Sequence, residues 1–399
     1  MHGSFARELF RRAGMARSLA LVDGAVPDTV SVALLDGVPR IVHDPHLPHC
    51  GLVGEFQLDA VGVNQIVLLV DRRQAVMQQL SPESTRFLAE LETCQFTGLD
   101  CVGKLNIAAQ NPRWQSSVVR VNRMSYRHNV REVIRLALLE QHNDTGTTVM
   151  LLVGGTSASG KSVLVDELQR GIEDFTMLAT KPSVVSLDNY FKNLTDPTYP
   201  LTATGEKNCE DVNALRLGVV EDHVRALTRG VEVQQPVFDL GAGSITNSTT
   251  RTQPSRVLLI EGIFALHPRI RALCEQYGHI TTILAQPLSS LPLDELRRVA
   301  NDELRLVRCI VRDHGTRHRS AAVTLARWPL VTAGEPTHTF PYVHGVERIV
   351  NTAVTHELGA LQIVADQLLR RVPRTDATYG RAQHLRSLLA WHAPISNAP

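Results

Sequence analysis

The segment VMLLVGGTSASGKSVLVDEL, residues 149–168, decides the fold of this 399-residue chain. It runs from an apolar stretch into a glycine-rich turn, and then into a pattern with apolar residues at helical spacing. The turn has the spacing G-x-x-x-x-G-K-[ST] of a phosphate-binding loop, in the strand-then-helix context that this motif requires. The sequence therefore predicts a loop that holds the phosphates of a nucleoside triphosphate.

Each residue type in this loop has a physical role. The glycines let successive N–H groups face an anion, Lys161 reaches the β and γ phosphates, and the Ser162 hydroxyl coordinates Mg²⁺. We therefore expect ATP and Mg²⁺ as cofactors, although the motif does not decide between ATP and GTP. The expected nucleotide-binding residues are Gly155, Thr156, Ser157, Ala158, Ser159, Gly160, Lys161 and Ser162.

Outside the loop, short apolar runs alternate with helix-like segments, which is typical of a parallel sheet. Strands are predicted at 149–153, 184–187, 256–260 and 280–284. The predicted fold class is α/β: a P-loop NTPase fold with a mostly parallel sheet flanked by helices, plus a small N-terminal α/β region. The predicted units are an unassigned N-terminal region (1–96), a helical connector (97–145), a P-loop domain (146–372) and a C-terminal helical segment (373–399).

Composition narrows the function classes. Lys plus Arg number 41 against 40 Asp plus Glu, so no basic surplus is available to neutralise a nucleic acid. No apolar run reaches the roughly 20 residues that span a bilayer. The six cysteines form no CxxC pair, which favours a reducing, cytoplasmic location. The arginine-rich first 22 residues leave an organellar transit peptide open beside a plain amphipathic helix.

Two acidic residues end predicted strands. Asp188 closes PSVVSLD, and Glu261 closes RVLLIEG. Both are therefore expected at the carboxyl edge of the sheet, where ligands of such folds bind. There Asp188 can activate an attacking hydroxyl or approach the metal, and Glu261 can hold Mg²⁺. An ordinary turn role is the alternative for each.

Four motifs, taken in order, resemble a known family: GGTSASGKS, SLDNYFKN, VLLIEGIFAL and RLVRCIVRD. They are similar to the uridine kinase and phosphoribulokinase group of P-loop kinases. Within that group, the chain most resembles bacterial uridine-kinase-like nucleoside kinases with N-terminal domains related to threonyl-tRNA synthetase. The resemblance runs from about Thr97 to about Ile395 and leaves the first 96 residues unassigned.

The resemblance implies roles for individual residues. Asp188 matches the acid that activates the acceptor hydroxyl, and Glu261 matches the acid at the metal. Arginines of the segment 305–319 are expected to close over the triphosphate and neutralise charge during transfer. These arginines are Arg305, Arg308, Arg312 and Arg317, of which Arg312 and Arg317 join Lys161, Asp188 and Glu261 in the expected catalytic set. Cys309 departs from the pattern, because a second consecutive arginine is usual there.

The expected acceptor-contacting residues are Tyr190, Asn208, Phe238 and Asp239. Several positions around them differ from the uridine kinase pattern. Asn208 is aligned with an aspartate that holds the ribose hydroxyls, and Ile245 with an arginine. Gly243 is aligned with a base-contacting histidine of uridine kinases, although the subgroup named above often has glycine there too. Because buried polar contacts determine substrate discrimination, these changes put uridine itself in question.

The sequence thus predicts an ATP-dependent phosphotransferase, a small-molecule kinase acting on a hydroxyl of a nucleoside. A kinase of another small acceptor, such as a sugar phosphate, and a nucleotide-binding regulatory protein without catalysis are the alternatives. The expected partner is a small-molecule substrate, without nucleic acid or membrane; a homo-oligomer is left open. The segment HDPHLPHC, residues 43–50, admits either a zinc site or a polar loop.

Overall fold

The computed structural model describes residues 3–24, 30–35, 38–41, 57–60, 66–69, 98–139, 147–176, 181–202, 205–288, 291–295, 297–343 and 345–395. The histidine-rich segment 43–50 lies outside these residues, so its zinc hypothesis stays untested.

A five-stranded parallel sheet organises the part of the chain that follows residue 147. Its strand order is β11-β10-β5-β9-β6, and each neighbouring pair is parallel. The strands are β5 (Val149–Gly154), β6 (Ser183–Ser186), β9 (Val257–Glu261), β10 (His279–Gln286) and β11 (Arg348–Asn351). The four predicted strands are confirmed, and the predicted α/β class with them; β11 and a β7–β8 hairpin were not anticipated.

Both faces of the sheet are covered, as the apolar strands require. Alternate residues of β5 enter different cores: Met150 and Leu152 face α7 and α8, whereas Leu151 and Val153 face α5 and α6. The covering helices are α5 (Pro112–Leu139), α6 (Lys161–Thr176), α7 (Leu217–Thr228) and α8 (Pro268–Glu275). The antiparallel hairpin of β7 (Val233–Asp239) and β8 (Ser244–Thr252) follows α7.

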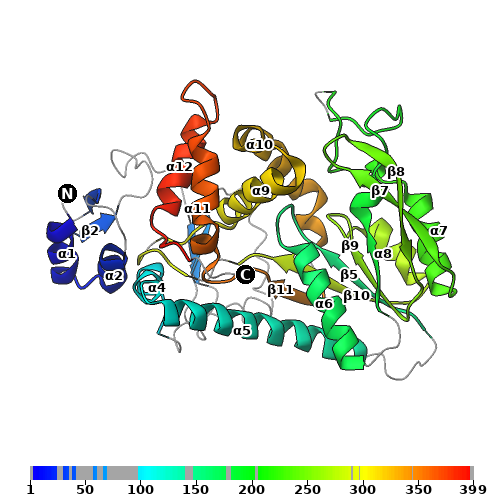
Figure 1. Cartoon of the computed structure of the whole chain (residues 1–399), viewed down its shortest axis with the longest axis horizontal. Coiled ribbons are helices and arrows are strands. Elements are labelled where there is room, and N and C mark those ends of the chain that lie inside the picture. The colour runs from blue at the N-terminus through cyan, green and yellow to red at the C-terminus, as the bar shows by residue number, and fades with distance from the viewer. Residues whose placement is uncertain are drawn as a thin grey trace.

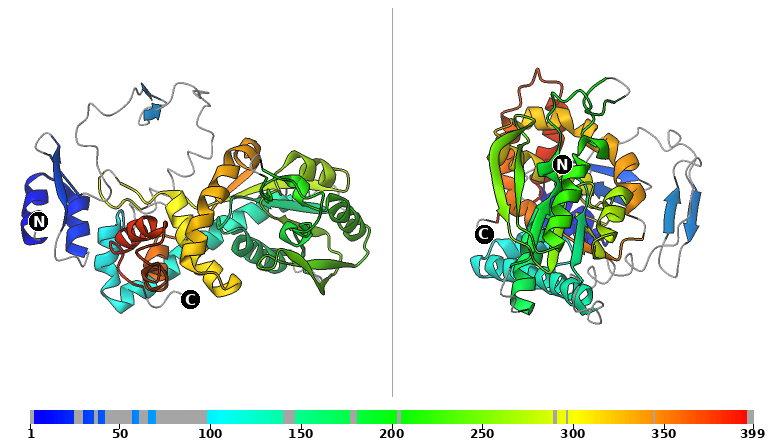
Figure 2. Two further views of the ribbon diagram at one scale, coloured as in Figure 1. Left: turned by 90° about the horizontal axis from the view of Figure 1, so that it is seen from above. Right: turned by 90° about the vertical axis from the view of Figure 1, so that its right-hand side faces the viewer.

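A separate helical core joins the N-terminal and C-terminal parts of the chain. It is built by α1 (Gly3–Arg12), α2 (Ala16–Gly24), α4 (Val102–Ala109), α9 (Asn301–Arg317), α10 (Ala321–His338), α11 (Glu357–Arg370) and α12 (Tyr379–Leu389). Figure 1 shows α1 and α2 at one end of the long axis and the parallel sheet at the other, with α5 running along one side between them. The left view in Figure 2, which is seen from above, shows the same separation.

The N-terminal region contains the predicted mixture of helices and short strands. Antiparallel pairs are formed by β1 (Val32–Leu35) with β2 (Val38–Ile41), and by β3 (Gln57–Ala60) with β4 (Ile66–Leu69). Phe10 of α1 is fully buried in the helical core, so the arginine-rich start of the chain forms the expected amphipathic helix. Among the residues described above, no helix is both long and apolar enough to cross a membrane.

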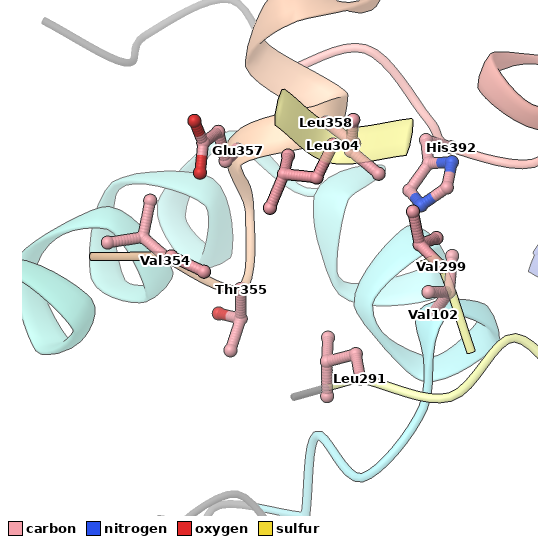
Figure 3. A pocket seen from close by; sticks show the side chains of 10 residues that line it. Val102, Leu291, Val299, Leu304, Val354, Thr355, Glu357, Leu358 and His392 are labelled. Carbon is pink, nitrogen blue, oxygen red and sulfur yellow. The ribbon is translucent and has the colours of Figure 1, made fainter. Parts of the chain in front are cut away.

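The helical core contains a small cavity between α4, α9, α11 and the C-terminal segment (Figure 3). Its volume is about 20 Å³, which has room for about one water molecule. His392 lies on one side, and burial lowers its pKa to about 4, so the imidazole is neutral near pH 7. The cavity is too small for a substrate, and we assign it to packing.

Candidate active site

The glycine-rich loop connects β5 to α6 at the carboxyl edge of the sheet. Gly155 has φ +147°, and a Cβ atom there would lie 2.4 Å from the carbonyl oxygen of Ala285. Only glycine allows the loop to pass so close to β10. The amide of Ser159 donates to the carbonyl of Thr156 over 3.1 Å, which closes the turn. The predicted strand, loop and helix are therefore all present.

Lys161 lies at the first position of α6 with its side chain inside the loop. It is 9% exposed, and Nζ donates to the carbonyls of Gly155 (3.0 Å) and Thr156 (2.9 Å). Burial lowers the pKa of this ammonium, while the carboxylates of Glu261 and Asp188 act in the opposite direction. The loop therefore surrounds the Lys161 ammonium, and the carboxylates of Glu261 and Asp188 offset part of its positive charge.

Two hydroxyls of the loop are buried without a partner. Thr156 Oγ1 and Ser159 Oγ have no hydrogen-bond acceptor or donor within the described part of the chain. Leaving a buried hydroxyl unpaired costs about 1–3 kcal/mol. A phosphate group provides the acceptors that these hydroxyls and the loop amides lack, so the loop fits the triphosphate that its sequence predicts.

The two acids predicted at the metal lie at the ends of adjacent strands, β9 and β6. Glu261 is the last residue of β9, next to Ser186 of β6, whose hydroxyl donates to Glu261 Oε1 over 2.5 Å. The Ser162 hydroxyl also bonds Glu261. Burial, and then the nearby Asp188 carboxylate, raises the pKa of Glu261. Ser162, Glu261 and Asp188 are therefore brought together at the edge of the sheet, as predicted.

This set of oxygen ligands fits Mg²⁺. The described residues contain no cluster of three or more His, Cys, Asp or Glu side chains that could hold a metal by itself. Mg²⁺ characteristically binds through one or two carboxylates together with substrate phosphates and water. A hydroxyl and two carboxylates beside a phosphate loop match that preference.

Asp188 lies in the short 3₁₀ helix Leu187–Tyr190 directly after β6. Its side chain is half-buried, and it interacts electrostatically with both Lys161 and Glu261. The carboxylate therefore lies just after the carboxyl end of β6 and has access to solvent. This is the position at which an acid can contact an incoming hydroxyl.

Comparison with known proteins agrees with this arrangement. Residues 150–283 match the model of the phosphoribulokinase / uridine kinase family. This region belongs to that kinase group. The chain is 25% identical to a uridine kinase of Vibrio campbellii over 177 residues, which covers 43% of this chain and 78% of the relative. A uridine kinase of Clostridium botulinum is 21% identical over 191 residues, with coverages of 48% and 80%.

Solved structures of kinases are also similar to the chain. One is a putative fructose transport system kinase from Silicibacter sp. TM1040, with 18% identity, a TM-score of 0.40 and coverage of 55% of this chain and 98% of that one. Another is a possible uridine kinase from Bacillus stearothermophilus, with 12% identity, a TM-score of 0.34 and coverages of 56% and 98%.

Two of the predicted arginines of this kinase region support the phosphate loop from behind. Arg305 is 3% exposed; its Nε donates to the Ser157 carbonyl over 2.9 Å, and its other nitrogens hold Glu335 in a bidentate ion pair. Arg308 donates to the Ala158 carbonyl over 3.2 Å and pairs with Glu357. These two arginines therefore hold the loop backbone, a role the sequence analysis did not predict for them.

The other two arginines share one buried acid. Arg312 and Arg317 contact Asp313 over 2.8 Å and 3.1 Å, and Arg312 also interacts electrostatically with Lys161. The Arg312 side chain is 34% exposed, so it keeps access to the site. Cys309, where the kinase pattern has arginine, is buried in the helical core instead. Its Sγ accepts from Arg312 over 3.1 Å.

The expected acceptor residues divide into two groups. Phe238 is half-buried, with its ring 5.8 Å from that of Phe191. Tyr190 is fully buried, and its hydroxyl bonds His223 over 2.8 Å, so its side chain faces the core. Asp239 accepts from the amides of the hairpin turn, and Asn208 accepts from the amide of Glu210. Phe238 thus packs against the edge of the core through Phe191 and stays partly exposed.

The sequence analysis overlooked Glu210, two residues after Asn208. Its side chain packs against α10, where a Cβ on Gly334 would lie 2.6 Å from Glu210 Cγ. Burial, and then Glu335, raises the Glu210 pKa to about 7, and Lys161 and Asp188 also act on it. Glu210 therefore interacts electrostatically with Lys161 and Asp188 of the candidate site. The sequence signal was an acid in the segment KNCEDVNAL, residues 207–215, which also contains Asn208.

Gly243 stands where the uridine kinase pattern has a base-contacting histidine. The structure leaves no room for a side chain at this position. Gly243 has φ +67°, and a Cβ there would lie 2.3 Å from Leu194 Cδ1. Its carbonyl accepts from the Leu194 amide over 2.9 Å. A side chain at 243 would therefore be strained and would collide with Leu194.

Asn122 of the connector helix α5 bonds the segment that follows β11. Asn122 Oδ1 accepts from Thr355 Oγ1 over 2.8 Å and from the Thr355 amide over 3.4 Å. Thr355 lies three residues after Thr352, whose hydroxyl bonds the Ser159 carbonyl in the phosphate loop. The segment after β11 therefore joins α5 to the nucleotide-binding loop.

We expect Asn122→Ala to raise the Kd for ATP by roughly three- to tenfold, about one net hydrogen bond, without a comparable loss of kcat. The reason is that segment 352–355 loses its anchor to α5. Equilibrium nucleotide binding measures the effect, and Asn122→Asp, which keeps the accepting oxygen, serves as the matched control. Equal ATP affinity in Asn122→Ala and the wild type would rule out this coupling.

Proposed function

We propose that this chain is an ATP-dependent phosphotransferase that moves the γ-phosphoryl group to a hydroxyl of a small, ribose-containing acceptor of the nucleoside class. The observation that supports it most is the meeting of Lys161 and Ser162 with Glu261 and Asp188 at one edge of the sheet. The uridine kinase relatives support the nucleoside class.

In this proposal each residue has a defined task. The loop amides and Lys161 position the phosphates, and Arg312 faces the charge that develops during transfer. Ser162 and Glu261 would hold Mg²⁺, which neutralises phosphate charge. Asp188 accepts the proton of the acceptor hydroxyl. The oxygen of that hydroxyl forms a bond to the γ-phosphorus, and the bond between the γ-phosphorus and ADP breaks.

Glu210 is the acid we assign to the acceptor side. It lies between α10 and the phosphate loop, and its electrostatic neighbours are Glu335, Lys161, Asp188 and Arg305. An ionised carboxylate accepts hydrogen bonds from hydroxyls and donates none. We therefore expect the ionised form of Glu210 to hold acceptor hydroxyls next to Asp188.

This assignment predicts a pH dependence. Because the pKa of Glu210 is raised to about 7, the carboxyl is protonated below that pH and accepts fewer hydrogen bonds. The kcat/KM for the acceptor should therefore rise as pH increases through about 7. The measurement is a pH profile of wild type and Glu210→Gln; the variant should lose the step at pH 7. An unchanged midpoint in Glu210→Gln would assign the step to another group.

One observation favours an acceptor other than uridine. Leu194 occupies the space beside Gly243, where the resembled pattern has a base-contacting histidine. A site without that polar contact discriminates weakly between bases. The acceptor is therefore either a nucleoside recognised mainly through its sugar or a sugar phosphate.

The test is Mg²⁺-dependent ADP release from ATP in the presence of a panel of nucleosides and sugar phosphates. Stimulation by a nucleoside supports the proposal in full. Stimulation by sugar phosphates alone keeps the phosphotransferase and replaces the acceptor class. ATP binding without stimulation by any acceptor would favour the nucleotide-binding regulatory protein instead.

A further inference from the structure

A basic pocket lies outside the active site, beside the beginnings of α7 and α8. Its volume is about 560 Å³, and it is open to solvent. The charged residues that line it are Lys192, Arg216, Asp222 and Arg269. Figure 1 shows α7 and α8 at the same end of the molecule as the sheet. None of the predicted nucleotide, metal or acceptor residues lines this pocket.

Arg216 is the least compensated of these cations. Its Nε and Nη2 atoms are buried without a hydrogen-bond partner within the described ranges. Burial lowers its pKa, and Tyr190 is the neighbour that opposes this shift. An arginine stays protonated at any physiological pH. The protein therefore keeps a positive charge at this wall of the pocket without pairing it to a carboxylate of the described residues.

The other two cations have neutral partners. Lys192 Nζ donates to Thr198 Oγ1 over 3.1 Å and to the Thr198 carbonyl over 3.3 Å, and Arg269 Nη1 donates to Asn213 Oδ1 over 2.6 Å. The one carboxylate lining the pocket, Asp222, is already paired with Arg225. The pocket therefore carries an excess of positive charge.

From these contacts we propose that the pocket is a second phosphate-binding site, for a small phosphorylated molecule. Guanidinium groups bind phosphate oxygens through paired charge-assisted hydrogen bonds, and an ammonium adds a point charge. The volume lies in the range of small-ligand pockets. The first amides of α7, which begins at Leu217, add partial positive charge at the same wall.

The pocket is connected to the catalytic segment through the backbone. The Arg216 amide donates to the Tyr190 carbonyl, and the Lys192 amide donates to the Ala214 carbonyl, both over 2.8 Å. Tyr190 lies two residues after Asp188. A phosphate that bridges Lys192 and Arg216 would therefore stabilise the pairing of the two segments behind Asp188.

The experiment is calorimetric titration of the full chain with inorganic pyrophosphate. Two sites can bind this probe, and two variants separate them. Lys161→Ala should weaken binding at the phosphate loop and leave the pocket unchanged. Arg269→Gln, at an exposed residue, should weaken pocket binding by roughly tenfold or more, the loss of one charge-assisted hydrogen bond. Arg216→Gln should have the same effect.

The matched control is Arg229→Gln, an exposed arginine at the opposite end of α7. It should bind pyrophosphate as the wild type does. A Kd unchanged in both Arg269→Gln and Arg216→Gln would overturn the proposal, as would loss of all binding in Lys161→Ala.

Comparing inorganic phosphate with a nucleoside monophosphate identifies the source of the phosphate group. An Arg269-dependent Kd that is tenfold lower for the nucleotide supports a phosphorylated metabolite. Equal Arg269-dependent affinities support the site but assign it to free phosphate.

Discussion

Asp188→Asn is expected to lower acceptor-stimulated ADP release by roughly 10²–10⁴-fold, the usual contribution of a positioned general base. The amide keeps the shape of the side chain but cannot take the proton of the acceptor hydroxyl. ATP affinity should change little, because the loop and Lys161 hold the phosphates. The measurement combines steady-state ADP release with equilibrium ATP binding.

The matched control is Asp166→Asn, an exposed acid on α6, which should keep the wild-type rate. A folded Asp188→Asn protein with an unchanged kcat would remove Asp188 from the catalytic set. Near-complete loss of ATP binding in that variant would instead assign Asp188 to the metal alone.

The second large effect is on stability. Arg305→Met is expected to lower the free energy of unfolding by about 3–5 kcal/mol, because it leaves the Glu335 carboxylate buried without its partner. Both side chains of this pair are almost fully buried, at 4% and 7% exposure. Chemical denaturation measures the change.

Two further variants distinguish charge burial from general disruption. Arg305→Met combined with Glu335→Met removes both charges and should recover most of the lost stability. Arg327→Met, at an exposed position on α10, should change stability by no more than about 0.5 kcal/mol. A loss below about 1 kcal/mol in Arg305→Met would contradict a tightly coupled pair.

The nucleotide side of the site could be predicted from local sequence. A phosphate loop is a contiguous motif, and its glycines, lysine and serine are each required by backbone geometry or charge. Asp188 and Glu261 could also be predicted from the sequence, because the carboxyl ends of neighbouring parallel strands meet at one edge of the sheet. Their convergence with Lys161 also depends on the strand order β5-β9-β6, which only the structure shows.

The acceptor side and the arginine contacts depend on tertiary structure. Arg305 and Arg308 bind the loop carbonyls because α9 packs behind the loop, about 150 residues away in sequence. Asp239 and Asn208 bond nearby amides, a use of Asp and Asn that turn chemistry offers as readily as a ligand does. Glu210 was missed because its neighbour in space, α10, follows more than 100 residues later.

The most direct test of the central claim is the transfer of label from [γ-³²P]ATP to the acceptor that best stimulates ADP release. The account predicts label in an organic phosphate ester, in equal amount to the ADP formed, and loss of that ester with Asp188→Asn. Label that appears only as inorganic phosphate, at the same rate in both proteins, would contradict it.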